Sequence, residues 1–109
     1  MGVYGDIPAG VLTPLTADGF TLHAPSPNPF NPRTSIRFRL GEDGPVQVRV
    51  YDVRGREVVK LVDESLPAGE HDVIWEGRDA AGRRVADGPY VVELRDAQRR
   101  AVQELMLVE

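Results

Sequence analysis

The sequence has no cysteine and only one lysine, Lys60, beside twelve arginines. Without cysteine, the chain has no disulfide, no thiolate nucleophile and no zinc site of the cysteine type. Its net charge is −4, and its basic side chains are mixed with a larger number of acidic ones. Because binding to nucleic-acid backbones requires a basic excess, nucleic acid is not expected as a partner.

Long apolar runs are also missing. No stretch approaches the ~20 residues that a membrane-spanning helix needs, and the first residues, Met1 to Asp6, lack the basic and apolar regions of a signal peptide. With 109 residues and 41% hydrophobic content, the chain suits a single domain. We expect a soluble protein that does not insert into a membrane and that, if exported, is part of a longer chain.

Residues suited to catalysis are sparse. The two histidines, His23 and His71, fall on different predicted strands, and no serine or acid near either forms a recognisable nucleophile arrangement. We expect His71 to pack in or beside the core. Loop acids such as Asp79 and Asp87 lack the spacing of a calcium-binding loop and are interpreted as turn residues. The sequence predicts a protein that is not an enzyme, with no catalytic residue, cofactor, metal or small-molecule ligand.

Composition divides the chain near residue 27. Residues 1–26 have no lysine or arginine, whereas charge is dense beyond Arg33. We predict an extended arm or linker over residues 1–26, with a first strand at 20–23, and a β-sandwich domain over residues 27–109. The arm is too apolar for a purely solvated linker, so we expect it to pack along its own domain or to add a strand to a neighbour's sheet edge. Its apolar residues are Val3, Tyr4, Ile7, Val11, Leu12 and Leu15.

Apolar and polar residues alternate with a period of two over residues 35–40 and 46–50, as in half-buried strands. Strong turn residues at 41–45 predict that these two strands form an antiparallel pair. The Asp-x-x-Gly pattern at 52–55 is typical of a type I turn that leads into a hairpin with residues 57–62. Alternation fails in this last strand, and a β-bulge or burial of both faces would each explain the failure.

Further strands are expected at residues 71–75, 90–95 and 101–108. Turns recur about every ten residues, and no helical period is longer than a turn or two. The pattern therefore predicts an all-β fold, an immunoglobulin-like antiparallel β-sandwich of six to seven short strands with essentially no helix. The side chains predicted to hold its structural core are Phe38, Val48, Tyr51, Trp75 and Tyr90.

Several spaced motifs carry a resemblance to a known family. In chain order they are Pro27-Asn28-Pro29-Phe30-Asn31-Pro32, Thr34 to Phe38, Val50 to Val58, Leu61-Val62, Pro67-Ala68-Gly69, Trp75 to Asp79, and Gly88 with Tyr90. With these motifs, residues 27–108 resemble the FlgD-like immunoglobulin-type module that occurs at the C-termini of many secreted bacterial proteins. That module overlaps the type A C-terminal sorting domains of the type IX secretion system.

The resemblance implies a non-catalytic module that secretion or surface-attachment machinery recognises, and that sorts or anchors an upstream cargo. The protein would pass through the periplasm and be secreted or held at the cell surface, and its partners would be proteins. The recognition elements expected on this basis are the proline-rich lead-in and the last strand. Their residues are Asn28, Pro29, Phe30, Asn31, Pro32, Val102, Leu105, Leu107 and Val108.

An alternative function is a structural self-assembly subunit that joins copies by strand exchange or as a filament, through the apolar arm and unequal charge. Residues 33–56 hold six arginines against three acids, and residues 57–79 hold seven acids against two basic residues. Arg37, Arg39 and Arg49 are expected on one face of neighbouring strands. Ordinary cross-strand pairs with acids are the simpler interpretation of this face.

A carbohydrate-binding module is the third candidate function. It requires an exposed aromatic platform on which a sugar ring can stack. The chain has one tryptophan, three tyrosines and three phenylalanines, and most of them fall on predicted core faces. Only Tyr4 and Phe30 are left for such a platform.

Overall fold

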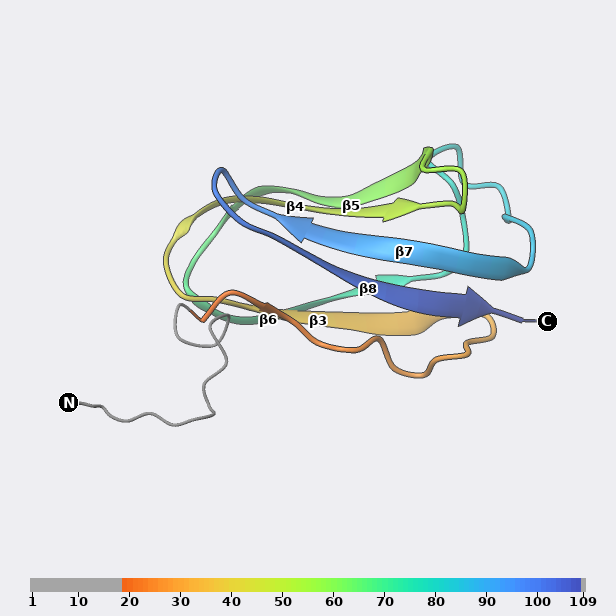
Figure 1. Cartoon of the computed structure of the whole chain (residues 1–109), viewed down its shortest axis with the longest axis horizontal. Helices are drawn as coiled ribbons and strands as arrows, with labels where there is room; N and C mark the ends of the chain where they lie inside the picture. Colours follow the sequence, from red (N-terminus) through yellow and green to blue (C-terminus); the bar gives the residue numbers. More distant parts are fainter. Residues whose placement is uncertain (1–18, 109) are drawn as a thin grey trace.

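The computed structural model (Figure 1) describes residues 19–108, which form two antiparallel sheets packed face to face. The three-stranded sheet has the order β2–β3–β6, and the four-stranded sheet has the order β5–β4–β7–β8. The strands are β2 (Thr21–Leu22), β3 (Thr34–Leu40), β4 (Gly44–Tyr51), β5 (Glu57–Leu66), β6 (Gly69–Trp75), β7 (Gly88–Arg95) and β8 (Arg100–Leu107).

The predicted fold class is confirmed, because the described residues form an all-β, immunoglobulin-like sandwich without a helix. It follows that no helix able to span a membrane occurs in this part of the chain. The predicted strand at 20–23 corresponds to β2. The apolar arm residues Val3, Tyr4, Ile7, Val11, Leu12 and Leu15 lie outside the described residues.

The core lies between the sheets, where the period of two places one apolar face of each strand. On β3 the inward side chains are Ile36, Phe38 and Leu40, each at most 3% exposed. The neighbouring strands contribute inward residues in the same alternating way. They are Phe20, Leu22, Val46, Val48, Val50, Trp75, Tyr90, Val92, Leu94, Leu105 and Leu107, with Phe30 from the lead-in.

The predicted pairing of residues 35–40 with residues 46–50 is wrong. β3 pairs with β2 and β6, whereas β4 pairs with β5 and β7, so the turn at 41–43 crosses from one sheet to the other. The apolar faces of the two strands oppose each other across the core. Alternation alone does not distinguish two strands that pair in one sheet from two strands that face each other in a sandwich.

The topology also shows that the expectation of a single face with all three arginines is wrong. Arg37 and Arg39 lie on the outer face of the three-stranded sheet, and Arg49 lies on the outer face of the other sheet. Each has an acid on a neighbouring strand of its own sheet, and Arg37 lies opposite Asp72 on β6. Arg39 Nη1 lies 3.5 Å from Glu70 Oε2, and Arg49 Nε lies 3.5 Å from Glu57 Oε1. Ordinary cross-strand pairs therefore account for these side chains.

The broken alternation of β5 is due to β-bulges. The pairing of β5 with β4 shifts between Val48 and Arg49 and again between Val50 and Tyr51. Each shift leaves one residue of β5, first Val58 and then Leu61 in chain order, without a partner directly opposite on β4. A bulge reorients the following side chains, which is why four apolar residues can fall within five positions of this strand.

Candidate interaction surfaces

The described residues contain no cluster of three or more histidines, aspartates or glutamates that could hold a metal ion. His71 stacks on Phe38, with ring centroids 5.4 Å apart, and its Nε2 lies 2.7 Å from the carbonyl oxygen of Pro67. His23 Nε2 lies 3.4 Å from Glu70 Oε1 on the outer face. Both histidines therefore have structural neighbours.

The proline-rich lead-in forms part of the four-stranded sheet. Phe30 bridges to Leu107 in the parallel sense, with Phe30 N–H donating to Met106 O at 2.9 Å and Val108 N–H donating to Phe30 O at 3.0 Å. The amide of Asn28 continues this contact: its Nδ2 donates to Glu104 O at 3.1 Å, and its Oδ1 accepts from Met106 N–H at 2.9 Å. The lead-in thus covers the outer edge of β8 over its last residues.

This arrangement separates the predicted recognition residues into two groups. Phe30, Leu105 and Leu107 are at most 2% exposed and pack in the core, so a partner cannot reach them in the folded module. The other six are exposed: Asn28, Pro29, Asn31, Pro32, Val102 and Val108. The lead-in and the last strand, far apart in sequence, form one continuous surface.

The exposed part of this surface is an apolar strip on β8. Val102 is 46% exposed, Met106 38% and Val108 43%. These even-numbered residues alternate with the buried Leu105 and Leu107, so they share the outer face of the sheet. Met106 was not among the predicted recognition residues. Met106 has the same parity along the chain as Val102 and Val108, and this parity could have identified it as exposed from the sequence.

The aromatic core anchors the lead-in from inside. Trp75 is 2% exposed, with its ring centroid 5.4 Å from that of Phe30 and 5.2 Å from that of Tyr90. The indole Nε1–H donates to Arg78 O at 2.9 Å, and the Tyr90 hydroxyl donates to Ala86 O at 2.6 Å. Because Phe30 is buried, it offers no platform for a sugar ring.

Tyr51, in contrast, does not lie in the core between the sheets. It follows the inward Val50 and therefore points to the outer face of the four-stranded sheet, where it is half-buried. Its hydroxyl donates to Glu93 Oε1 at 3.2 Å and accepts from Arg49 Nη1 at 3.4 Å. Arg100 Nε donates to the other oxygen of Glu93, whose side chain is 4% exposed.

This Glu93 cluster joins three strands of the sheet, because Arg49 lies on β4, Glu93 on β7 and Arg100 on β8. The hydrogen bond from Arg49 to Tyr51 raises the pKa of the Arg49 guanidinium, and the charges of Glu57 and Glu93 raise it further. A buried carboxylate with hydrogen-bonding partners on both oxygens is satisfied. We therefore interpret the cluster as structural, because it fixes the register of β4, β7 and β8 relative to one another.

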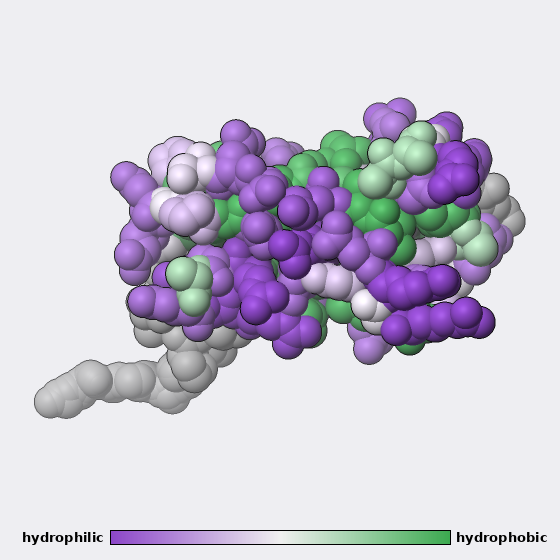
Figure 2. Space-filling view, turned by 90° about the horizontal axis from the view of Figure 1, so that it is seen from above, coloured by the Kyte–Doolittle hydropathy of each residue, from purple (hydrophilic) through white to green (hydrophobic). Residues whose placement is uncertain are grey.

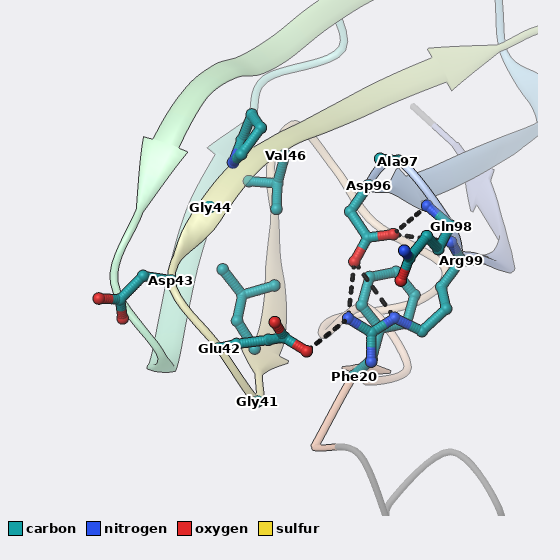
Figure 3. Close-up of a pocket in the computed structure, with 12 residues that line it drawn as sticks. Phe20, Gly41, Glu42, Asp43, Gly44, Val46, Asp96, Ala97, Gln98 and Arg99 are labelled. Atoms are coloured by element: carbon teal, nitrogen blue, oxygen red, sulfur yellow. Dashed lines mark hydrogen bonds and ion pairs between the residues drawn. The ribbon is translucent and has the colours of Figure 1, made fainter.

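The hollow shown in Figure 3 lies at one end of the sandwich and has a volume of about 190 Å³. Arg99 is at its centre: Nη2 lies 3.0 Å from Asp96 Oδ2 and 3.6 Å from Glu42 Oε2, and the guanidinium carbon lies 5.0 Å from the centre of the Phe20 ring. A single side chain thus joins the turn after β3, the turn after β7 and the segment before β2. Its contacts indicate that Arg99 has a structural role and holds these three segments together.

Three turns each contain an aspartate that accepts hydrogen bonds from its own loop: Asp52, Asp79 and Asp96. In the first, Asp52 Oδ1 accepts from the backbone N–H groups of Arg54 and Arg56, and Oδ2 accepts from Arg56 Nε. Asp79 is bonded in the same way by Ala81 and Arg83. The glycines of these two turns, Gly55 and Gly82, have positive φ, as predicted for Asp-x-x-Gly turns.

Acid is expected to destabilise the module through these turns. The backbone hydrogen bond from Arg56 is the main cause that lowers the pKa of Asp52, and the bond from Arg83 does the same for Asp79. Burial opposes the effect at Asp96, but the bonds from Gln98 and Arg99 outweigh it and lower the pKa of Asp96 as well. A carboxyl with a lowered pKa in the fold stabilises it above the unfolded value and loses that contribution as pH falls.

Urea unfolding at a series of pH values tests this expectation. The free energy of unfolding should be nearly constant from neutral pH down to about pH 5 and should fall below about pH 4. Asp96→Asn keeps an oxygen for the two backbone donors but cannot ionise, so its stability should fall less steeply with acid. An identical pH dependence in the variant and the parent chain would contradict the assignment.

The outer face seen from the side of β4, β5 and β7 is mostly hydrophilic (Figure 2), with hydrophobic residues visible between charged ones. Charged side chains on this face include Glu57, Lys60 and Asp63. Lys60 Nζ lies 3.3 Å from Asp63 Oδ2. A shallow hollow beside Asp63 is lined by Gln47, Arg95 and Asp96 as well, and Gln47 Nε2 donates to Asp63 Oδ1 at 3.2 Å.

Comparison with known proteins gives one family match. The profile of the FlgD Ig-like domain matches residues 31–99, which is more than half of the chain. A search of curated proteins gives no significant match.

Solved structures of similar fold include two FlgD proteins and a secretion component. FlgD of P. aeruginosa has a TM-score of 0.54 at 23% identity over 68% of this chain and 60% of that chain. FlgD of Xanthomonas campestris has a TM-score of 0.56 at 24% identity over 80% and 64%. PorZ of Porphyromonas gingivalis, a surface component of the type IX secretion system, has a TM-score of 0.58 at 24% identity over 92% and 13%. The chain thus spans less than two thirds of each of these proteins, and the likeness shows a shared fold.

Proposed function

The chain belongs to the FlgD Ig-like domain family, and on that premise we propose that it is a non-catalytic recognition module of a secreted or surface-located bacterial protein. Its role is to sort or anchor the protein to which it is attached, through contact with export or surface-attachment machinery. The structure of FlgD from Xanthomonas campestris is described in connection with the hook capping that is essential for flagellar assembly, and PorZ is described as an essential surface component of the type IX secretion system. Both descriptions support a protein partner outside the cytoplasm.

The observation that carries this proposal is the apolar strip of β8. Val102, Met106 and Val108 expose apolar side chains on one face of the sheet that also holds the lead-in, with the exposed Glu104 between Val102 and Met106. Exposed apolar side chains grouped on one face are typical of a surface that contacts another protein. Burying these three side chains against a partner would contribute apolar area at the centre of a larger contact.

A secretion assay tests the proposal directly. The chain is fused behind a reporter and expressed with an export signal in a bacterium that has a type IX system, and the reporter is measured in the medium, on the surface and in the periplasm. We expect the parent chain to direct export. The triple variant Val102→Ser, Met106→Ser, Val108→Ser should lower export about tenfold and leave the reporter in the periplasm.

The matched control is Val53→Ser. Val53 is the most exposed of the large apolar residues that the structure describes, at 71%, and lies in the turn after β4 rather than on the last strand. Its replacement should leave export unchanged. If the triple variant, shown to be folded by circular dichroism, were exported like the parent chain, the strip would not be the recognition surface. If the parent chain were not exported, the sorting role itself would be wrong.

A further inference from the structure

The two sides of the sandwich differ in how their sheet edges are closed. On one side the terminal strands are β2 and β8, where Phe30 bridges to Leu107 and Gln103 Nε2 donates to Leu22 O at 3.0 Å. On the other side the terminal strands are β5 and β6, which belong to different sheets and follow each other in the chain. Within residues 19–108, a single backbone hydrogen bond from a loop reaches these two strands: Ala80 N–H donates to Val58 O of β5 at 3.1 Å.

Of these two open edges, β5 is protected against further pairing and β6 is not. β5 has two register shifts and carries Lys60, and bulges and lysines are features that keep an edge strand from adding a neighbour. β6 pairs with β3 over seven residues in unbroken register. It contains no proline and no lysine. The edge of β6 is therefore regular and able to pair.

The backbone groups that face this edge follow from the pairing on the other side of β3. His23 N–H donates to Arg37 O at 3.0 Å, so the backbone polar groups of Arg37 point toward β2 and away from β6. Arg37 lies opposite Asp72. In an antiparallel pair, opposed residues either bond to each other or both point away, so the N–H and C=O of Asp72 point to the open edge. By alternation, those of Glu70 and Ile74 do so too.

A strand added beside β6 would meet different side chains on its two faces. On the outer face lie the exposed carboxylates of Glu70 and Asp72 and the side chain of Ile74, which is 44% exposed. On the inner face of β6 lie His71 and Val73. Across the gap, β5 directs Glu64 inward, together with three apolar side chains. These side chains, Val59, Val62 and Leu66, are only partly buried, whereas the closed side of the sandwich is sealed by fully buried residues.

We propose that the open edge of β6 binds an extended segment of a partner protein in which basic and apolar residues alternate. β3 already shows this chemistry along the opposite edge of β6. Its Arg37 lies opposite Asp72 and its Arg39 opposite Glu70, while Ile36 and Phe38 point into the core. A partner strand of the same pattern places cations beside the same two carboxylates and apolar side chains in the gap toward β5. Main-chain bonds supply affinity, and alternate side chains supply specificity.

Charge disfavours two other occupants of this edge. In an antiparallel pair of β6 strands from two copies, centred on Asp72, the two Asp72 carboxylates would lie opposite each other, and like charges at opposed positions are destabilising. Residues 1–19 contain two aspartates and no lysine or arginine, so the N-terminal arm of a neighbour lacks the cations that the edge selects. The proposal does not depend on the sorting role.

The test uses the intact chain and a capped, fluorescent peptide with the sequence of residues 33–40, Arg-Thr-Ser-Ile-Arg-Phe-Arg-Leu. Fluorescence anisotropy should show saturable binding that weakens with added salt. Replacing the arginines of the peptide with glutamate should weaken binding about tenfold or more. In amide hydrogen exchange, the peptide should slow exchange at Glu70, Asp72 and Ile74, whose N–H groups become bonded.

Variants of β6 separate edge pairing from other modes of binding. Ile74→Pro removes an edge N–H and leaves the bonds to β3 in place, so binding should weaken about tenfold, whereas Ile74→Val should bind like the parent chain. Asp72→Asn keeps the N–H and should reduce the salt dependence of binding. This variant and the exchange pattern carry the test if Ile74→Pro proves unfolded.

Three results would overturn the proposal. The first is equal binding of the basic and the acidic peptide. The second is undiminished binding by a folded Ile74→Pro variant, which would mean that the peptide binds elsewhere, for example by displacing β3. The third is self-association of the intact chain that Ile74→Pro abolishes, which would assign the edge to a second copy.

Discussion

Replacing Phe30 with alanine is expected to lower the free energy of unfolding by about 3–5 kcal/mol. The Phe30 ring is 1% exposed and lies against Trp75 in the core. Its backbone bonds to Met106 and Val108 cover the edge of β8. Alanine keeps these backbone groups but removes the apolar anchor that holds them against the strand. The loss should therefore combine a core cavity with a weakened sheet edge.

Urea unfolding followed by the fluorescence of Trp75, the only tryptophan, measures this change. Asn31→Ala is the matched control, because Asn31 is the exposed neighbour of Phe30 in the same lead-in. Its replacement should alter stability by no more than about 0.5 kcal/mol. An equally small effect of Phe30→Ala would mean that the lead-in does not contribute to the folded core. A newly exposed β8 edge should also make Phe30→Ala more prone to self-association on a sizing column.

Replacing Trp75 with alanine is expected to cost a similar amount, about 3–5 kcal/mol. Trp75 contacts two other aromatic rings, those of Phe30 and Tyr90, and such pairs add about 0.5–1.5 kcal/mol each beyond the area they bury. Its Nε1–H bond to Arg78 O holds the loop that follows β6. Alanine removes the ring contacts and the loop bond together.

Circular dichroism during urea unfolding is the suitable measurement, since the variant has no tryptophan. Trp75→Phe separates packing from hydrogen bonding, because phenylalanine retains an aromatic ring between Phe30 and Tyr90 but has no N–H. We expect Trp75→Phe to cost less than half as much as Trp75→Ala. A loss as large as that of alanine would show that the bond to Arg78, rather than ring packing, sets the stability of this region.

Much of the architecture was predictable because it depends on local pattern. Alternation identified the strands around Phe38, Val48 and Leu94, and the two Asp-x-x-Gly turns form as the sequence indicates. Phe38, Val48, Trp75 and Tyr90 are buried. Tyr51 was predicted to lie in the core, but it directly follows the inward Val50 and therefore points outward. In this strand, position was a better guide to burial than hydrophobicity.

The candidate surface was less accessible to sequence reasoning. The proline run and the last strand were both singled out, but as separate elements that a partner would contact. In the structure they bond to each other, which buries Phe30, Leu105 and Leu107 and leaves Val102, Met106 and Val108 exposed. The Glu93 cluster was also missed, since its members lie 42 and 7 residues from Glu93 along the chain and share no motif.

By itself, the sequence determined the β-strands, the positions of the turns and the membership of the family. These features depend on backbone preferences and on side chains a few residues apart. Only the tertiary structure decided which strands pair, so that β3 and β4 face each other across the core, the lead-in closes β8, and β6 keeps a regular open edge. The physical reason is that strand pairing joins residues far apart in sequence, while apolar alternation is satisfied equally well in several topologies.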